Sequence, residues 1–131
     1  MTLARSRYEE DGWTVVDVSR RNDETEGTPY DLKCTKDMAV RHVEVKGVGG
    51  VGSTVYVTAN ERAHATTSGD GVSHLFVVER IGLKTRNGEV VAVGGTVRYD
   101  GPFLPDEDRF VPTEYRYTVP DPSSPVDTSL R

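Results

Sequence analysis

The stretch HVEVKG, residues His42 to Gly47, sets two charged side chains into a segment that is otherwise rich in valine. Successive side chains of a β-strand point to opposite faces, so a strand here places Val43 and Val45 on one face. The other face carries Glu44 and Lys46. This pattern is typical of a strand with a solvated charged face, and it also fits one half of a metal-dependent phosphodiester site. Both interpretations stay open at this point.

Further strand patterns surround this segment. Runs of β-branched, aromatic and apolar residues predict strands over residues 13–19, 30–34, 39–47, 54–58 and 73–81. The pair Asn87-Gly88 is the strongest short signal for a two-residue hairpin turn, which we expect to join a final pair of strands.

Two helices are predicted. The first ten residues read as a short helix that Gly12 ends. A second helix begins at Thr58, because Thr58 and Glu61 have the spacing of a capping box, in which each side chain bonds the backbone N–H of the other residue. The element order predicts an α+β fold, similar to an α/β/α sandwich, with a mixed central sheet and flanking helices.

The length of 131 residues indicates a single domain. We expect it to span residues 1–119, followed by a flexible, proline-rich tail over residues 120–131. The one cysteine, Cys34, excludes an internal disulfide, fits a reducing compartment and is expected in the core. No apolar run is long enough to cross a membrane and the N-terminus lacks the apolar core of a signal peptide, so we expect a soluble cytoplasmic protein.

The net charge of −5 excludes the overall basic field that attracts nucleic acid to many binding domains. A nucleic-acid contact must therefore come from a local basic patch or from carboxylates neutralised by a metal ion. Basic residues near the predicted strand 30–34 could form such a rim: Arg20, Arg21, Lys33, Lys36 and Arg41. Scattered surface charge explains them equally well.

Glycines recur after the charged strand in the segment GVGGVGS, residues 47–53. The segment lacks the lysine and the serine or threonine that complete a phosphate-binding P-loop, and it does not open directly into a helix. We interpret it as a mobile loop near the charged strand, with a phosphate cradle as the alternative.

Asp31 and Glu44 are the candidate ligands of a hard cation, which prefers oxygen ligands. Their strands are joined by a short turn, so antiparallel pairing is the simplest topology and would make them neighbours. Lys46 would lie about 7 Å further along the face of Glu44, where its ammonium could orient water or stabilise charge on a phosphate. Further ligands are available: the carbonyl of Val45, and Glu9 or Glu10 from the first helix.

The order of Asp31, a turn and Glu44-Val45-Lys46 resembles the signature of the PD-(D/E)xK nuclease superfamily. A wider set of segments resembles the C-terminal domain of the protein NO VEIN, also called the DUF3883 domain: GWTVVDVS, PYDLKC, VEVKG, VTANERAHA and HLFVVERI. The resemblance covers about residues 8–80 and leaves the predicted hairpin outside it. It implies a restriction-endonuclease-like fold and a domain that often accompanies helicase or defence proteins.

The same resemblance implies which residues carry chemistry. It implies a Mg²⁺- or Mn²⁺-dependent site that draws on Asp31, Glu44 and Lys46 from the strands, Glu9 or Glu10 from the first helix, and Glu61 from the second helix. The sequence departs from the superfamily pattern at one position, because Tyr30 directly precedes Asp31 and Pro29 lies one residue earlier.

Structural explanations compete for several of these residues. An E-x-K pair on a strand is more often a solvated ion pair, contributing at most about 1 kcal/mol. Glu61 is explained by the capping box alone. His42, on the charged face, is expected to be a partly exposed strand histidine, and Trp13 a core residue. His64 and His74 lack a partner at zinc-ligand spacing, so no zinc site is predicted.

Two functions follow from these alternatives. The first is a Mg²⁺- or Mn²⁺-dependent nuclease domain that hydrolyses phosphodiester bonds, in DNA more than in RNA, in defence or nucleic-acid processing. The second keeps the fold without the chemistry, as a catalytically inactive module that binds nucleic acid or a protein. In either case a homodimer or a partner protein could supply substrate recognition, and no membrane partner is expected.

Overall fold

The computed structural model describes residues 2–19, 30–66, 69, 71–104 and 106–122. The elements follow in the order α1 (Thr2–Glu10), β1 (Thr14–Asp17), β2 (Leu32–Lys36), β3 (Ala39–Gly47), α2 (Ala59–Thr66), β4 (Val72–Arg86), β5 (Glu89–Pro102) and the 3₁₀ helix η1 (Glu107–Arg109). This arrangement of a five-stranded sheet and two α-helices confirms the predicted α+β class. No helix among the described residues is long and apolar enough to cross a membrane.

The sheet has the strand order β1-β2-β3-β4-β5, so β3 is its middle strand. β3 and β4 pair parallel, and the other neighbouring strands pair antiparallel. Parallel neighbours need a crossover connection, and α2 lies in the connection between β3 and β4. The predicted mixed sheet is therefore confirmed.

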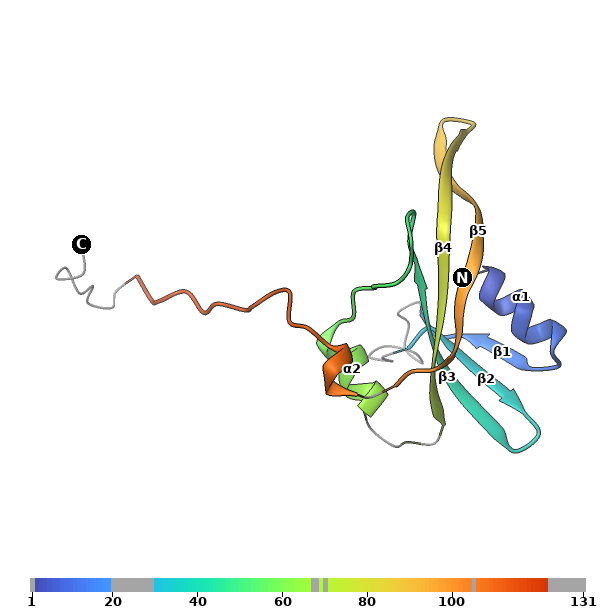
Figure 1. Ribbon diagram of the computed structural model, residues 1–131, viewed down its shortest axis with the longest axis horizontal. Helices are drawn as coiled ribbons and strands as arrows, with labels where there is room; N and C mark the ends of the chain where they lie inside the picture. Colours follow the sequence, from blue (N-terminus) through green and yellow to red (C-terminus); the bar gives the residue numbers. More distant parts are fainter. Residues whose placement is uncertain (1, 20–29, 67–68, 70, 105, 123–131) are drawn as a thin grey trace.

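The two α-helices cover opposite faces of the sheet (Figure 1). Tyr8 of α1 belongs to the buried cluster that contains Val43 and Phe76. On the opposite face, α2 contacts His42 and Lys46. The α1 side holds the hydrophobic core, whereas the α2 side holds polar and charged groups.

The core confirms one sequence prediction and modifies another. Cys34 is fully buried in it, and burial raises the pKa of its thiol to about 11. Trp13 packs at the margin of the core and is half-buried, with the guanidinium of Arg41 4.4 Å from the ring centroid. Trp13 thus covers the core edge with one face and binds a cation with the other.

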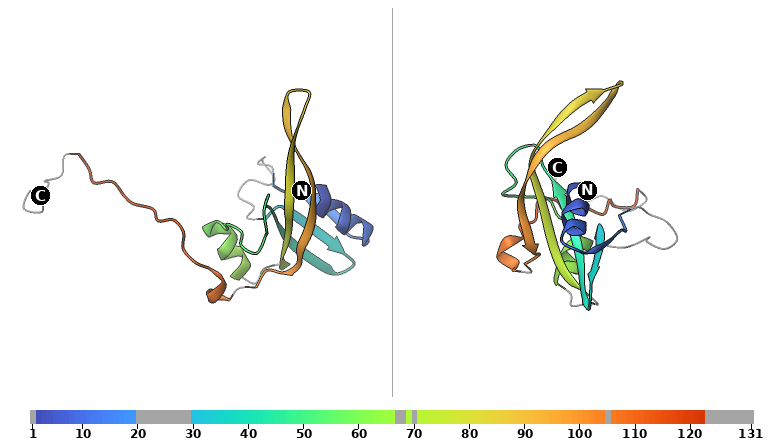
Figure 2. Two further views of the ribbon diagram at one scale, coloured as in Figure 1. Left: turned by 45° about the horizontal axis from the view of Figure 1, so that its top comes forward. Right: turned by 90° about the vertical axis from the view of Figure 1, so that its right-hand side faces the viewer.

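β4 and β5 continue beyond the sheet as a two-stranded ribbon, which projects from the body in Figure 2. β3 pairs with β4 only as far as Val78, whereas β4 and β5 pair up to Arg86 and Glu89. The predicted strand 73–81 and the first arm of the predicted hairpin are therefore one strand of 15 residues. Asn87 and Gly88 form its turn with φ of 52° and 80°, the positive values that a two-residue hairpin turn requires.

The predicted strand over residues 54–58 is wrong, because the structure has no strand there. A strand needs a partner for its backbone hydrogen bonds, and β3 and β4 already pair directly with each other. The segment instead runs beside the sheet and leads into α2. β1 and β2 are also shifted or shorter than predicted, since β2 begins at Leu32 and β1 ends at Asp17.

The glycine-rich loop after β3 is hydrogen bonded to β4. The N–H of Val48 donates to the carbonyl of Val78 at 2.9 Å, and the N–H of Gly52 donates to the buried Glu79 carboxylate at 2.8 Å. A Cβ at Gly52 would lie 3.0 Å from Val77 Cγ1, so glycine permits this close approach. Two N–H groups that a phosphate cradle would use are therefore already occupied. The end of the predicted tail, residues 123–131, lies outside the described residues.

The assignment of the core can be tested with one substitution at two sites. Leu32 is fully buried and Leu83, on the ribbon, is 76% exposed. Leu32→Ala should lower the free energy of unfolding by about 2–5 kcal/mol because it leaves a cavity. Leu83→Ala should change it by less than about 0.5 kcal/mol. Urea denaturation followed by circular dichroism measures both, and equal losses would contradict the core described here.

Candidate functional site

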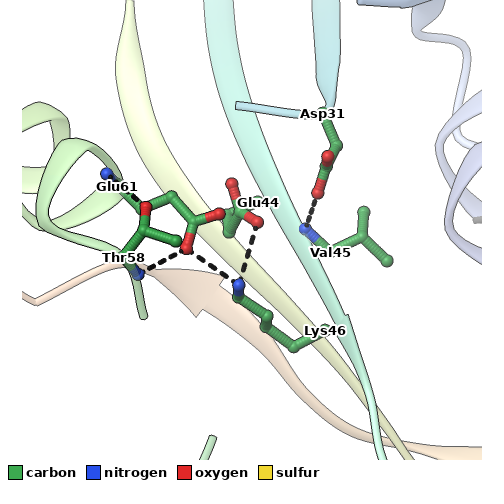
Figure 3. A network of polar contacts seen from close by, with 6 residues as sticks. All are labelled: Asp31, Glu44, Val45, Lys46, Thr58 and Glu61. Atoms are coloured by element: carbon green, nitrogen blue, oxygen red, sulfur yellow. Dashed lines mark hydrogen bonds and ion pairs between the residues drawn. The ribbon is translucent and has the colours of Figure 1, made fainter. Parts of the chain in front are cut away.

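The candidate site begins where β2 meets β3. These strands pair antiparallel, with Leu32 opposite Val43 as the last pair before Asp31. Asp31 lies just before the strand but stays attached to β3. Its N–H donates to the carbonyl of Val43 at 3.0 Å, and its carboxylate Oδ2 accepts from the N–H of Val45 at 2.8 Å (Figure 3). The predicted antiparallel pairing of the two strands is confirmed, and the negative charge of Asp31 acts on Glu44.

Lys46 joins two further carboxylates on the same face of β3. Its ammonium Nζ lies 2.8 Å from Oε1 of Glu61 and 3.4 Å from Oε1 of Glu44 (Figure 3). Glu61 comes from α2, so this pair of ionic contacts ties the helix to the middle strand. The structure thus brings together four of the predicted site residues, which we call the acidic cluster: Asp31, Glu44, Lys46 and Glu61.

Glu61 acts in the helix cap and in the cluster at the same time. The N–H of Thr58 donates to Oε1 of Glu61 at 2.9 Å, and the N–H of Glu61 donates to Oγ1 of Thr58 at 3.2 Å. This confirms the predicted capping box. The same Oε1 atom accepts from Lys46, so capping and site membership are compatible for this residue.

Glu44 is removed from water. Its side chain is 7% exposed, so the solvated-surface interpretation of this face is wrong. Burial, the negative charge of Asp31 and the neighbouring Glu61 together raise the pKa of Glu44 to about 9, against the opposing effect of Lys46. The physical cause is that α2 covers this face and leaves a carboxyl group without enough solvent or positive charge to favour its ionised form.

The partners of Glu44 keep their charges. Burial lowers the pKa of Lys46, but its hydrogen bond to Glu61 and the charges of Glu44 and Glu61 outweigh burial, so the pKa is raised overall. Burial likewise raises the pKa of Glu61, but the hydrogen bonds from Lys46 and Thr58 outweigh it, so the pKa is lowered overall. Lys46 is therefore an ammonium and Glu61 a carboxylate at neutral pH.

The donor set fits a hard cation that keeps part of its water shell. Asp31 and Glu44 are adjacent acids, and the acidic cluster holds three carboxyl groups against one ammonium. No group of three or more His, Cys, Asp or Glu side chains that could hold a metal ion occurs within the described ranges. Mg²⁺ is commonly held by one or two carboxylates with several waters, so Asp31 and Glu44 suit Mg²⁺ better than a fully protein-ligated ion.

The remaining predicted ligands lie elsewhere or are partly used. Glu9 and Glu10 are exposed on α1, which covers the opposite face of the sheet, and Glu9 pairs with Arg5 at 2.7 Å. The structure therefore does not bring them to the acidic cluster. The N–H of Val45 donates a hydrogen bond to the Asp31 carboxylate, so the backbone of Val45 adjoins the cluster. The side chain of Val45 packs against the core.

A ring stack beside the cluster escaped the sequence analysis. Tyr30 stacks on His42 with ring centroids 4.1 Å apart, and Nδ1 of His42 lies 3.1 Å from Nε2 of His64. His42 is 3% exposed, so the prediction of a partly exposed histidine is wrong. The spacing of the histidines was the available signal. His64 lies three residues after Glu61, on the same face of the helix, and His42 lies two residues before Glu44, on the same face of the strand, so the contact between Glu61 and this face of β3 also brings the two histidines together.

Two members of the predicted basic rim, Lys36 and Arg41, lie on the α1 side of the sheet and not around Asp31. Lys36 donates to the carbonyl of Asp11 at 2.6 Å, and Arg41 lies over Trp13, on the side of α1. Lys33 lies opposite His42 in the register of β2 and β3. The other two members, Arg20 and Arg21, lie outside the described residues.

The burial of Glu44 predicts a pH-dependent stability difference. A folded-state pKa of about 9 means that unfolding releases a proton above the ordinary pKa of 4.5, so wild-type stability falls as the pH rises between these values. Glu44→Gln has no proton to release. In EDTA it should exceed the wild type by at least about 1 kcal/mol at pH 8 and match it at pH 4.

Urea denaturation at pH 4, 6 and 8 measures this difference. Glu10→Gln, at an exposed position of α1, is the matched control and should track the wild type at each pH. A loss of stability in Glu44→Gln that is the same at every pH would contradict the raised pKa.

The sequence model of the family described as Protein NO VEIN, C-terminal, matches residues 1–92. The match is wider than the segments 8–80 that carried the resemblance, and it includes the whole acidic cluster and the tip of the ribbon. Searches of curated proteins and of solved structures found no match. Because the family model covers most of its length, this chain belongs to the NO VEIN C-terminal family.

Proposed function

We propose that this chain is a Mg²⁺- or Mn²⁺-dependent nuclease domain that hydrolyses phosphodiester bonds, in DNA more than in RNA, in defence or nucleic-acid processing. The observation that carries the proposal is that Asp31 is hydrogen bonded to Val45 of β3, between Glu44 and Lys46, whose ammonium lies 3.4 Å from the Glu44 carboxylate. Family membership and the resemblance to the PD-(D/E)xK signature support it.

Asp31 and Glu44 would hold the metal ion, with the Val45 carbonyl as a further candidate ligand. The ion, when bound, polarises the phosphate and supplies a hydroxide-like nucleophile at neutral pH. The carboxyl groups of the acidic cluster outnumber its one ammonium group, and a divalent cation would offset this excess of acidic groups. This excess is an argument for a cation site that does not depend on the resemblance.

Lys46 would stabilise negative charge on the phosphate. Its raised pKa keeps the amine protonated, so it suits electrostatic stabilisation and is poorly suited to act as a general base. Glu61 would hold the ammonium in place through the 2.8 Å contact. Glu61 is therefore a positioning residue in this proposal, and the α2 cap fixes its orientation.

A second candidate function is a catalytically inactive module of the same fold that binds nucleic acid or a protein. The contacts of Lys46 favour it, because an ammonium already held by Glu44 and Glu61 also serves to fasten α2 to the sheet. Divalent metal binding separates the two functions, since a purely structural cluster has no need of the ion.

Lys46→Ala should lower nuclease activity by about 10²-fold or more, because it removes charge stabilisation at the phosphate. The assay uses supercoiled plasmid, linear duplex, single-stranded DNA and RNA with Mg²⁺ or Mn²⁺. Lys84→Ala, at an exposed ribbon position, is the matched control and should keep wild-type activity. Thermal melting in parallel confirms that each variant is folded at the assay temperature. Wild-type protein that cuts none of these substrates would refute the nuclease proposal.

Asp31→Asn should abolish binding of Mn²⁺, measured by electron paramagnetic resonance or calorimetry, because an amide is a weak ligand for a hard cation. Asp37→Asn is the matched control, since Asp37 lies in the exposed turn between β2 and β3 and its positive φ of 53° suits asparagine. Mn²⁺ binding that is equal in both variants, or absent from the wild type, would favour the inactive binding module.

A further inference from the structure

A groove of about 1050 Å³ runs along the α2 side of the sheet. Leu75 and Val77 of β4 and Tyr99 of β5 lie along its floor. One wall is the segment 52–59 between β3 and α2, and the other is formed by residues 102–104 and 109–116, from the end of β5 onward. Both segments run on the α2 side in Figure 1.

The groove lies next to the acidic cluster. In the parallel register of β3 and β4, Leu75 is the partner of Glu44 and Val77 is the partner of Lys46. Paired residues of neighbouring strands share a face of the sheet, so the floor of the groove and the cluster lie on the same face. The floor residues Leu75 and Val77 are therefore one strand away from Glu44 and Lys46.

The groove is basic although the protein is acidic. Its lining contains one carboxylate, Glu114, and four arginines, Arg62, Arg98, Arg109 and Arg116, whereas the whole chain has a net charge of −5. Arg98 pairs with Glu79 at 3.4 Å and Arg109 pairs with Asp106 at 3.5 Å, and their side chains, 43% and 64% exposed, still reach solvent. A local excess of guanidinium groups attracts a polyanion and suits phosphate oxygens.

Exposed aromatic rings line the same groove. Tyr56 is 78% exposed, Tyr115 is 86% exposed and Tyr99 is 37% exposed. Aromatic rings beside arginines are the combination that binds single-stranded nucleic acid, because unpaired bases stack on the rings while the backbone follows the positive charge. In a duplex the bases already stack on one another, so the rings would have no such role.

We propose that this groove binds single-stranded nucleic acid and leads its backbone to the acidic cluster. The binding step stands on the groove alone, whereas delivery to a cleavage site rests on the proposed nuclease function. Arg98, Tyr99 and the wall formed by residues 102–104 and 109–116 lie beyond residues 1–92, so part of the binding surface lies outside the segment that matches the family.

The test measures binding of a fluorescein-labelled oligothymidine of 12 nucleotides by fluorescence anisotropy in EDTA. Tyr56→Ala and Arg98→Ala should each weaken binding at least about fivefold, through lost stacking and a lost phosphate contact. Matched controls outside the lining, Tyr117→Ala and Arg86→Ala, should bind as the wild type does. All four are surface substitutions, and thermal melting verifies their folding.

Several outcomes would overturn the inference: no binding of the oligonucleotide, equal competition by a duplex or by polyglutamate, or wild-type binding by both groove variants. Measurement without metal separates this inference from the nuclease proposal. Binding that depends on Tyr56 and Arg98, in a protein that cuts nothing when Mg²⁺ or Mn²⁺ is added, supports the groove and refutes the nuclease. Cleavage that is unaffected by the groove variants supports the nuclease and refutes the groove.

Discussion

The middle position of β3 is the constraint on which the rest of the structure depends. β2 and β4 occupy its two edges, and α1 and α2 cover its two faces. Every side chain in its centre is therefore removed from bulk water, whether it is apolar or charged. Burial suits Val43, because its apolar side chain packs into the hydrophobic core beneath α1. Burial of Glu44 requires polar partners, and β2 and α2 bring these to the other face.

Stability alone does not explain a buried cluster of three acids and one amine. Desolvation of buried charges costs more than their attraction returns in many proteins, and apolar replacements are often neutral or stabilising. The raised pKa of Glu44 reflects this desolvation cost, because burial disfavours the ionised carboxylate. Perturbed groups of this kind concentrate at functional sites, where chemistry or ligand binding offsets the loss. The cluster is therefore the candidate functional site of this fold.

The distribution of charge gives the α2 side two distinct halves. The acidic cluster on β3 suits a cation, and the arginine-lined groove on β4 and β5 suits a polyanion. The two halves are joined by the parallel pairing of β3 with β4, which sets Glu44 beside Leu75. A metal ion and a phosphate backbone are complementary ligands, so one surface can hold both. An acidic protein can in this way bind a polyanion without a basic overall charge.

Local sequence signals determined the parts of the fold that depend on short-range bonds. The alternation in Ala39–Gly47 predicted β3 at its observed bounds, Asn87-Gly88 predicted the ribbon turn, and the spacing of Thr58 and Glu61 predicted the cap of α2. The short connection between the second and third strands predicted their antiparallel pairing, which brings Asp31 to β3. Each of these features is governed by residues that lie close together in the chain.

Only the tertiary structure decided which surfaces are covered. It buried Glu44 and His42 beneath α2, and it placed Glu9 and Glu10 on the other side of the sheet. It also left residues 54–58 without a strand partner, so that they became a wall of the groove. Burial and pairing depend on segments far apart in sequence. A strand pattern records two faces, but it does not record what packs against either one.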